Sequence, residues 1–149
     1  MGSTTAAGST LAISATAPAT FDDVGYEAVV FTEVGGIDKI GGLGAVFAKV
    51  EFQPLKGPKD KHKGSRDNGS LAPSMAFDEE DAGQVLMQTA SDDKTSKIYY
   101  FEVVYPTGAK RWFGGRVFGM PETVDGADSI ITANPTIEII TDIVRKAAP

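Results

Sequence analysis

Apolar and polar residues alternate along several short segments of the chain, which is the pattern of half-buried β-strands. One such strand is predicted over residues 45–52, and Pro54 prevents it from continuing. A short apolar run over residues 26–31 is followed by Gly35 and predicts a second strand. The apolar face of the 45–52 segment consists of Val46, Ala48, Val50 and Phe52.

The second half of the chain predicts a β-hairpin and further extended segments. Residues 98–105 and 110–118 are rich in aromatic and β-branched side chains. Between them lies Pro106-Thr107-Gly108-Ala109, in which proline presets φ and glycine allows a left-handed turn position. Residues 129–132 are extended as well, and a C-terminal strand is predicted over about 136–145.

One helix is predicted over about residues 78–91. Asp78 is a suitable N-cap, and the acidic residues that follow it suit the positive end of the helix dipole. Gly83 is expected to weaken the helix by roughly 1 kcal/mol relative to alanine. The residues that share the apolar face of this helix are Ala82, Val85, Leu86, Thr89 and Ala90.

Together these elements predict a mainly β protein, an antiparallel β-sandwich or barrel with one flanking α-helix, a long loop and terminal arms. Residues 1–20 are small and polar, and we expect them to form a flexible N-terminal arm. Residues 21–149 are then the β-sandwich domain, and a chain of 149 residues is long enough for one such core.

The loop predicted over residues 55–74 has a charge opposite to that of the rest of the protein. The window 56–66 carries +4, whereas the whole chain carries −6, so the remainder carries −10. Glycine and proline predict that the loop is irregular. Its candidate binding residues are Lys56, Lys59, Lys61, Lys63 and Arg66.

Two partners fit such a loop: a polyanion, or an acidic surface of another copy of the protein. Nucleic-acid loops usually combine cations with aromatic side chains for stacking. Between Phe52 and Phe77 the only aromatic ring is that of His62, so the composition favours docking on protein. The remaining possibility is that the charges are simply solvated.

The sequence predicts no catalytic, cofactor-binding or metal site. Cysteine is absent, and His62, the only histidine, lies between two lysines in the loop. The glycines of residues 36–44 lack the Lys-Ser/Thr pair of a phosphate-binding loop. The acids of residues 78–81 would point about 100° apart on a helix and cannot converge on one ion. An enzyme is therefore not expected.

Neither a membrane span nor a secretory signal is predicted. No apolar run approaches the roughly 20 residues that cross a bilayer. The first basic residue is Lys39, so a basic signal-peptide start is missing, and we expect the protein to be made and used in a cytoplasm or to leave it by a route other than a signal peptide.

Taken end to end, the chain resembles the tail tube (major tail) proteins of long, non-contractile phage tails. The resemblance is one of order and spacing from about Thr20 onward, and it departs from the family at residues 140–143, where a glycine turn is often found. The segments that carry it are Ala19–Glu27, Val34–Ile37, Lys63-Gly64, Asp67–Ser70, Met75–Asp78, Asp81–Gln84, Phe113–Val117, Asp125–Asp128 and Thr136–Ile139.

This resemblance implies a virion protein that assembles into hexameric rings, which stack into the tube that conducts DNA into the host. The loop 55–74 would bridge successive rings. The implied partners are other copies of the chain, a tape-measure protein, a tail initiator or distal tail protein and a tail terminator. The alternative is a soluble β-sandwich binding module that uses the basic loop on nucleic acid or another polyanion.

Overall fold

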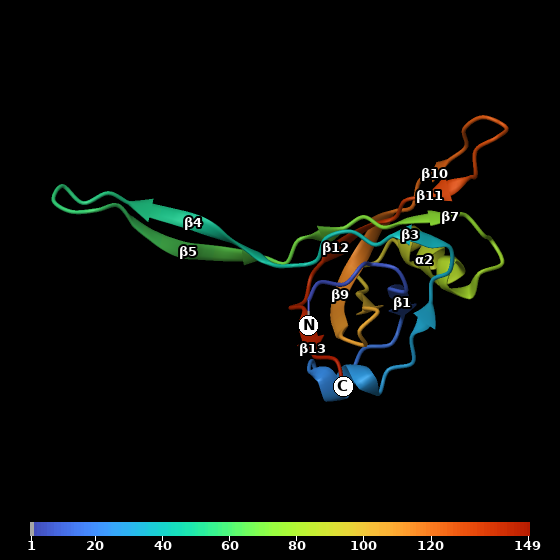
Figure 1. The fold of residues 1–149 in the computed structure, drawn as a ribbon, viewed down its shortest axis with the longest axis horizontal. Coiled ribbons are helices and arrows are strands. Elements are labelled where there is room, and N and C mark those ends of the chain that lie inside the picture. The colour runs from blue at the N-terminus through green and yellow to red at the C-terminus, as the bar shows by residue number, and fades with distance from the viewer. Residues whose placement is uncertain (1) are drawn as a thin grey trace.

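Two antiparallel sheets enclose the core, and a separate pair of strands extends away from them (Figure 1). The computed structural model describes residues 2–149. The strands of the larger sheet are β1 (Thr10–Ser14), β2 (Thr32–Glu33), β6 (Ser70–Leu71), β8 (Tyr99–Val104), β9 (Lys110–Gly119), β12 (Thr136–Ile139) and β13 (Val144–Lys146). Those of the smaller sheet are β3 (Ile37–Lys39), β7 (Ser74–Ala76), β10 (Glu122–Thr123) and β11 (Thr132–Ala133). The separate pair is β4 (Val46–Phe52) and β5 (Asp60–Asp67), and the helices are α1 (Asp23–Glu27) and α2 (Ala82–Asp92).

The strands do not follow one another in chain order. The larger sheet runs β2-β1-β8-β9-β12-β6, with β13 also pairing with β9, and the smaller runs β10-β11-β7-β3. Core side chains come from both sheets and from α2, and the most deeply buried include Leu11, Met75, Met87, Phe101 and Ile137. The predicted mainly β, antiparallel sandwich with one long flanking helix is confirmed.

The predicted hairpin of residues 98–118 is the centre of the larger sheet. Strands β8 and β9 pair from Tyr99 with Gly115 to Val104 with Lys110. The turn between them closes with a hydrogen bond from the Gly108 amide to the Tyr105 carbonyl at 2.9 Å. Gly108 has φ +96°, as the turn chemistry predicted.

Helix α2 begins at Ala82, four residues later than predicted. Its N-cap is Asp81, whose carboxylate accepts hydrogen bonds from the amides of Gln84 and Gly35, each at 3.0 Å. The Asp78 carboxylate instead accepts from the Glu80 amide at 3.0 Å, in the turn before the helix. Asp81, and not Asp78, caps the helix because its carboxylate also accepts a hydrogen bond from Gly35, outside the helix.

The buried Gln84 side chain joins the helix to β7 and to the segment between β2 and β3. Its amide nitrogen donates to the carbonyls of Gly35 at 2.9 Å and Ala76 at 2.8 Å. Its amide oxygen accepts from the Asp78 backbone at 2.9 Å. All three bonds are made inside the protein, where a missing partner would be costly.

The expected flexible arm over residues 1–20 is wrong in its central part. Residues 10–14 form β1, which pairs with β8 along its whole length and with β2 at its other edge. Leu11 and Ile13 are fully buried. Only two large apolar residues were visible in this segment, but long-range pairing is sufficient to bury them.

The strand expected over residues 26–31 is also wrong. The short helix α1 covers its beginning because the Asp22 carboxylate caps it, accepting from the Gly25 amide at 2.8 Å. Tyr26 is thereby turned into the protein and stacks on Trp112 with 5.8 Å between ring centroids. Both rings are fully buried.

Burial of Tyr26 leads to a prediction for alkaline pH. Burial raises the pKa of its hydroxyl above the ordinary value of 10.0. The stability that depends on the neutral phenol is therefore complete below pH 10 and is lost as the pH rises through the folded-state pKa. Tyr26→Phe should lose less stability between pH 7 and pH 11 in urea unfolding experiments. Burial also raises the pKa of Tyr99, so the variant should keep part of the pH dependence of stability. Equal losses of stability with pH in wild type and in Tyr26→Phe would contradict the prediction.

The C-terminal strand predicted over 136–145 is two strands. β12 and β13 both pair with β9, but with different parts of it. Between them the Thr141 hydroxyl accepts from the Gly114 amide at 2.6 Å, and the Ile140 amide donates to the Gly114 carbonyl at 2.8 Å. These bonds take the place of the glycine turn and lead the chain back along β9.

Candidate interface: the projecting hairpin

Most of the segment predicted to be an irregular basic loop, residues 55–67, forms the tip and the second strand of a long β-hairpin, and residues 70, 71 and 74 belong to β6 and β7 of the body. Strands β4 and β5 pair with each other and with no other strand among residues 2–149. Figure 1 shows the hairpin extending from one side of the two-sheet body, with the connection between its strands at the far end. At about 3.4 Å per residue, the seven residues of β4 correspond to roughly 24 Å of strand. Glycine and proline are confined mainly to the tip, so they do not prevent pairing.

One face of the hairpin is uncovered and carries the apolar side chains of β4, while the β5 residues that pair with Val46, Val50 and Phe52 on this face are Asp67, His62 and Asp60. Alternation along β4 places four apolar residues on this face. The prediction that they lie on one face of a strand holds, but the prediction that they are half-buried is wrong. Their side chains meet no other layer, and the three largest, Val46, Val50 and Phe52, are 68%, 53% and 62% exposed. An exposed apolar surface of this kind is typical of an interaction site.

The other face is basic. The pairing of Lys49 with Lys63 and of Glu51 with Lys61 places all four side chains on the same side. Phe47 lies there too, with the Lys63 ammonium 5.0 Å and the Arg66 guanidinium 5.7 Å from its ring centroid. Glu51 forms ion pairs with Lys49 at 2.9 Å and with Lys59 at 3.5 Å. The face retains an excess of cations.

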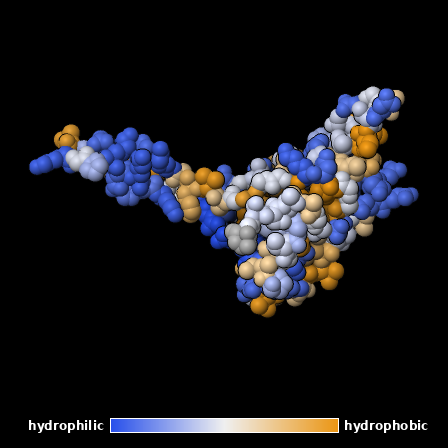
Figure 2. All heavy atoms as spheres, in the orientation of Figure 1, coloured by the Kyte–Doolittle hydropathy of each residue, from blue (hydrophilic) through white to orange (hydrophobic). Residues whose placement is uncertain are grey.

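The tip is structured by its own hydrogen bonds. The Gln53 side-chain amide donates to the Pro54 carbonyl at 3.1 Å and to the Gly57 carbonyl at 3.2 Å. Gly57 has φ +125°, a conformation that favours glycine. Leu55 is completely exposed at this tip. Figure 2 shows an apolar spot near the end of the projection, then a hydrophilic stretch, and apolar atoms again where the projection joins the body.

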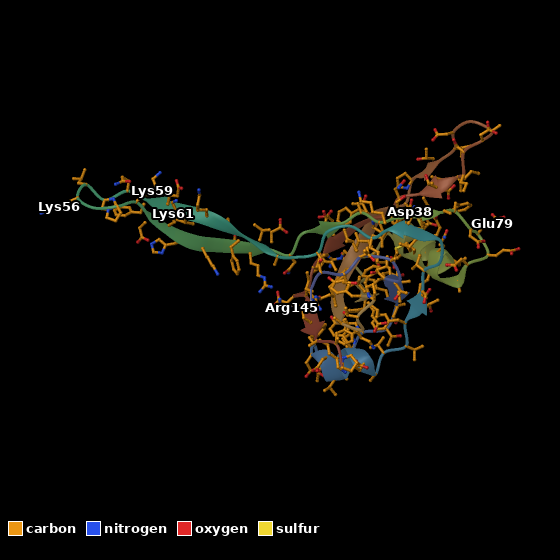
Figure 3. The ribbon with its side chains drawn as sticks, viewed as in Figure 1. Asp38, Lys56, Lys59, Lys61, Glu79 and Arg145 are labelled. Atoms are coloured by element: carbon orange, nitrogen blue, oxygen red, sulfur yellow. The ribbon has the colours of Figure 1, made fainter. Side chains whose placement is uncertain are left out.

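The five predicted binding residues all lie on this hairpin, but in different places. Lys56 is at the tip, Lys59 follows it, and the remaining three, Lys61, Lys63 and Arg66, lie on β5 (Figure 3). The structure adds two residues that sequence reasoning missed, Lys49 and Phe47, because it brings β4 beside β5. Across residues 46–67, six basic and three acidic side chains give a net charge of +3, so the rest of the chain carries −9.

The only histidine of the sequence also lies on this hairpin. His62 pairs with Asp60 at 2.9 Å on the exposed surface of the hairpin. No group of three potential metal ligands occurs among residues 2–149, and no helix there is long and apolar enough to cross a membrane.

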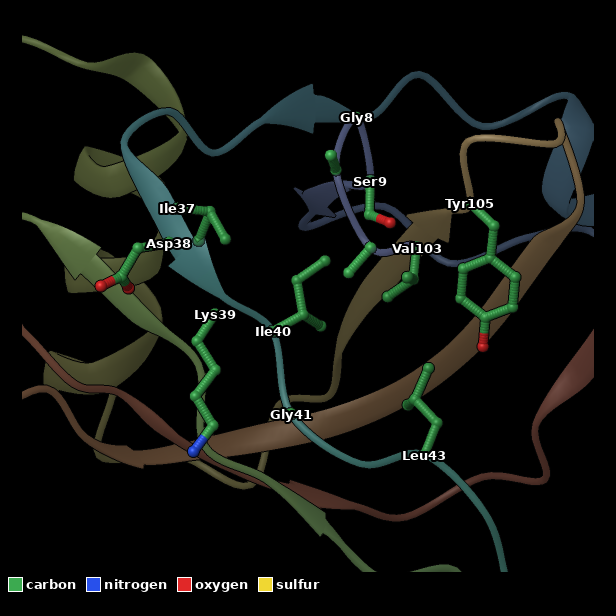
Figure 4. Close-up of a pocket in the computed structure, with 12 residues that line it drawn as sticks. Gly8, Ser9, Ile37, Asp38, Lys39, Ile40, Gly41, Leu43, Val103 and Tyr105 are labelled. Atoms are coloured by element: carbon green, nitrogen blue, oxygen red, sulfur yellow. The ribbon is translucent and has the colours of Figure 1, made fainter. Parts of the chain in front are cut away.

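A cavity lies between the N-terminal segment, β3 and β8. Its walls are largely aliphatic and aromatic, with Ile40, Leu43 and Tyr105 around it. Figure 4 shows Asp38 and Lys39 together on one side. This cavity has no nucleophile paired with a base.

Comparison with known proteins shows a similarity of fold and no similarity of sequence to a known family. No protein-family model and no curated protein sequence matches the chain. Three solved assemblies contain chains of similar structure. A chain from the PVC sheath/tube terminator of an extracellular contractile injection system, in the extended state, has a TM-score of 0.67 at 8% identity, over 99% of both chains. A chain of the anti-feeding prophage baseplate has a TM-score of 0.69 at 6% identity, also over 99% of both.

The third similar chain comes from the tail of an empty GTA particle. Its TM-score is 0.63 at 12% identity, covering 82% of this chain and 90% of that one. The protein therefore has a fold that is also found in chains of injection-system and GTA tail assemblies.

Proposed function

We propose that this protein is a structural subunit of a tail tube, which assembles with copies of itself into hexameric rings that stack into a conduit for DNA. The observation that supports this most is the β4–β5 hairpin, which leaves both of its faces and both of its edges free in a single copy. A two-stranded hairpin by itself is only marginally stable in water. Contact with a neighbouring subunit would provide the missing layer.

The exposed apolar side chains of β4 would supply most of the affinity in such a contact. Burying one valine or phenylalanine side chain contributes about 1.5–3 kcal/mol. An exposed ion pair contributes only about 0.2–1 kcal/mol. The basic face would then mainly select an acidic partner surface and set its orientation. Because the rest of the chain carries −9, another copy is a suitable partner.

Two of the structural neighbours support a ring of six. The baseplate structure is described as sixfold symmetrised, and the GTA tail was refined with C6 symmetry. Contractile injection systems are among the neighbours, so the more specific assignment to long, non-contractile tails rests on the sequence resemblance. In such a tail the tape-measure, initiator and terminator proteins would be the further partners, and the virion tail would be the location.

The proposed role is mechanical and needs no catalytic group. Phosphate binding grows with the number of cations presented to DNA. A tube whose subunits confine their excess cations to a hairpin between rings would therefore let DNA pass without holding it.

Electron microscopy of the purified protein tests this proposal. Concentrated wild-type protein should show rings and stacked tubes in negative stain. The Lys59→Glu/Lys61→Glu/Lys63→Glu variant should lose the tubes, because its hairpin would be repelled by the acidic surface of the next ring. A matched control is Lys39→Glu/Lys94→Glu/Lys97→Glu. Like the hairpin variant it changes the net charge from −6 to −12, but its substitutions are at exposed positions of the body.

The outcomes separate assembly from polyanion binding. Equal tube formation by the hairpin variant would contradict the bridging role, and a wild-type protein that forms neither rings nor tubes would contradict assembly itself. Tight binding of wild type to DNA with a steep salt dependence would instead support the alternative binding module.

A further inference from the structure

A groove with an apolar floor and an acidic rim lies between α2 and β10. Its volume is about 280 Å³, and Phe77 and Val85 are the apolar residues that line it. Val85 is 49% exposed, an unusual degree for a valine on the long helix of the fold. The rim carries four carboxylates and no cation, and these belong to Asp78, Glu79, Asp92 and Glu122.

The tip of the β4–β5 hairpin has the complementary chemistry. Leu55 is fully exposed at its end and is flanked by Lys56 and, a few residues on, by Lys59. The hydrogen bonds of Gln53 hold this tip in one shape, which lowers the conformational entropy that docking would cost. An exposed apolar side chain followed by two lysines therefore lies at one end of the molecule, and the ammonium of the second, Lys59, is 3.5 Å from Glu51. An apolar floor between carboxylates is open elsewhere.

Within one copy these two surfaces cannot meet. Figure 3 shows Lys56 at the end of the hairpin and Glu79 at the opposite end of the molecule. Tip and groove are different surfaces, so a contact between them in two copies is heterologous and leaves one free tip and one free groove. Such a contact repeats from subunit to subunit.

We propose that the groove between α2 and β10 receives the hairpin tip of a second copy, with Leu55 against Phe77 and Val85, and with Lys56 and Lys59 against the acidic rim. This inference rests on the proposed self-assembly and specifies which surface the hairpin contacts. The charges select this occupant: the lining has no cation, while the tip segment 53–59 has two lysines and no acid.

Engineered disulfides provide the direct test, because the chain contains no cysteine. Differently tagged Leu55→Cys and Val85→Cys proteins are mixed under assembly conditions and oxidised. A disulfide requires Cα atoms roughly 4.4–6.8 Å apart, so a mixed 55–85 product reports docking in the groove. The matched control replaces Val85→Cys by Val30→Cys, another valine, which is 87% exposed and lies outside the groove. We expect at least about tenfold more mixed product with position 85 than with position 30.

Charge exchange tests the same contact without cysteine. A tip variant, Lys56→Glu/Lys59→Glu, and a groove variant, Glu79→Lys/Asp92→Lys/Glu122→Lys, each place like charges on both docking surfaces, because the groove variant changes the charge of the rim from −4 to +2. Each alone should need at least about tenfold more protein to assemble. A mixture should assemble nearly as well as wild type, because every tip then finds a groove of opposite charge.

The results distinguish this inference from the function on which it rests. If wild type forms rings or tubes, but no mixed 55–85 product appears and mixing the charge variants restores nothing, the groove is not the docking site and the proposed function stands. Binding of the wild-type tip to a different tail component in place of a second copy would also overturn the inference. If wild type forms no assemblies and no mixed product, both proposals fail.

Discussion

Replacing residues 47–66 by Asn-Gly is expected to abolish ring and tube assembly while the body of the protein unfolds at an unchanged temperature. The replacement joins Val46 to Asp67, which are already paired across the hairpin, so a two-residue turn can connect them. What is removed contacts the body only weakly: Arg66 approaches Asp142 at 3.9 Å, and both side chains are exposed. The free energy of unfolding should therefore change by less than about 1 kcal/mol.

Sedimentation velocity and thermal unfolding followed by circular dichroism measure the two effects separately. A second variant, Val50→Thr/Phe52→Thr, tests the apolar side chains alone. Threonine is compatible with a β-strand, and the substitutions leave all the charges of the hairpin in place. Losing two buried side chains at an interface corresponds to about 3 kcal/mol, or a roughly 100-fold higher concentration for assembly. A large fall in melting temperature in the shortened protein would show that the hairpin stabilises the body. Intact tubes would show that it does not hold the subunits together.

Gly83→Ala is expected to destabilise the protein by about 3 kcal/mol, although alanine is the better helix former. Helix α2 lies so close to the segment after β2 that a Cβ atom at position 83 would overlap the Glu33 carbonyl oxygen and lie 2.6 Å from the Val34 Cα. These are backbone atoms, so the helix itself would have to move. The movement would also strain the bonds from Asp81 and Gln84 to Gly35.

Urea unfolding at neutral pH measures this effect. Gly126→Ala is the control, since a Cβ there meets nothing within 4 Å and its φ is not positive. That variant should stay within about 0.5 kcal/mol of wild type. If Gly83→Ala were about 1 kcal/mol more stable than wild type, helix propensity would outweigh the steric overlap with the backbone of residues 33 and 34. The inferred close approach of α2 to that backbone would then be wrong.

The close approach at Gly83 also gives physical meaning to part of the tail-tube resemblance. Two of the segments that carry it, residues 34–37 and 81–84, meet in the fold. Asp81 caps α2 and accepts from the Gly35 amide, and Gln84 donates to the Gly35 carbonyl. These residues hold the helix on the sheets, so this part of the pattern reports the fold and not a chemical site.

Local chemistry made some elements predictable from the sequence. The β8–β9 hairpin follows from a Pro-Thr-Gly-Ala turn between aromatic strands, because the turn restricts φ wherever it occurs. A helix at α2 was predictable, but its first residue and its buried face were not: of the five residues predicted to share the apolar face only Ala90 is buried, and the buried residues of the helix are Gly83, Gln84, Met87 and Ala90. The basic surface was predictable because its charges are close together in the chain.

Long-range contacts decided the elements that were predicted wrongly. β1 contains few large apolar residues and becomes a central strand only because β8 and β2 pair with it. Tyr26 lies on a short helix and not a strand, because Asp22 caps that helix and Trp112 receives the ring. Nothing within either segment indicates the partner.

The sequence by itself determined a mainly β sandwich with one long helix, and a basic segment on an acidic chain. Only the tertiary structure decided that this segment is one strand of a projecting hairpin, and that the apolar face of β4 is uncovered. Alternation specifies which side chains share a face, because it is a property of the strand, but burial depends on whether another layer packs against that face. The acidic groove is likewise a tertiary feature, since α2 and β10 are distant in the chain and come together only when the sheets fold.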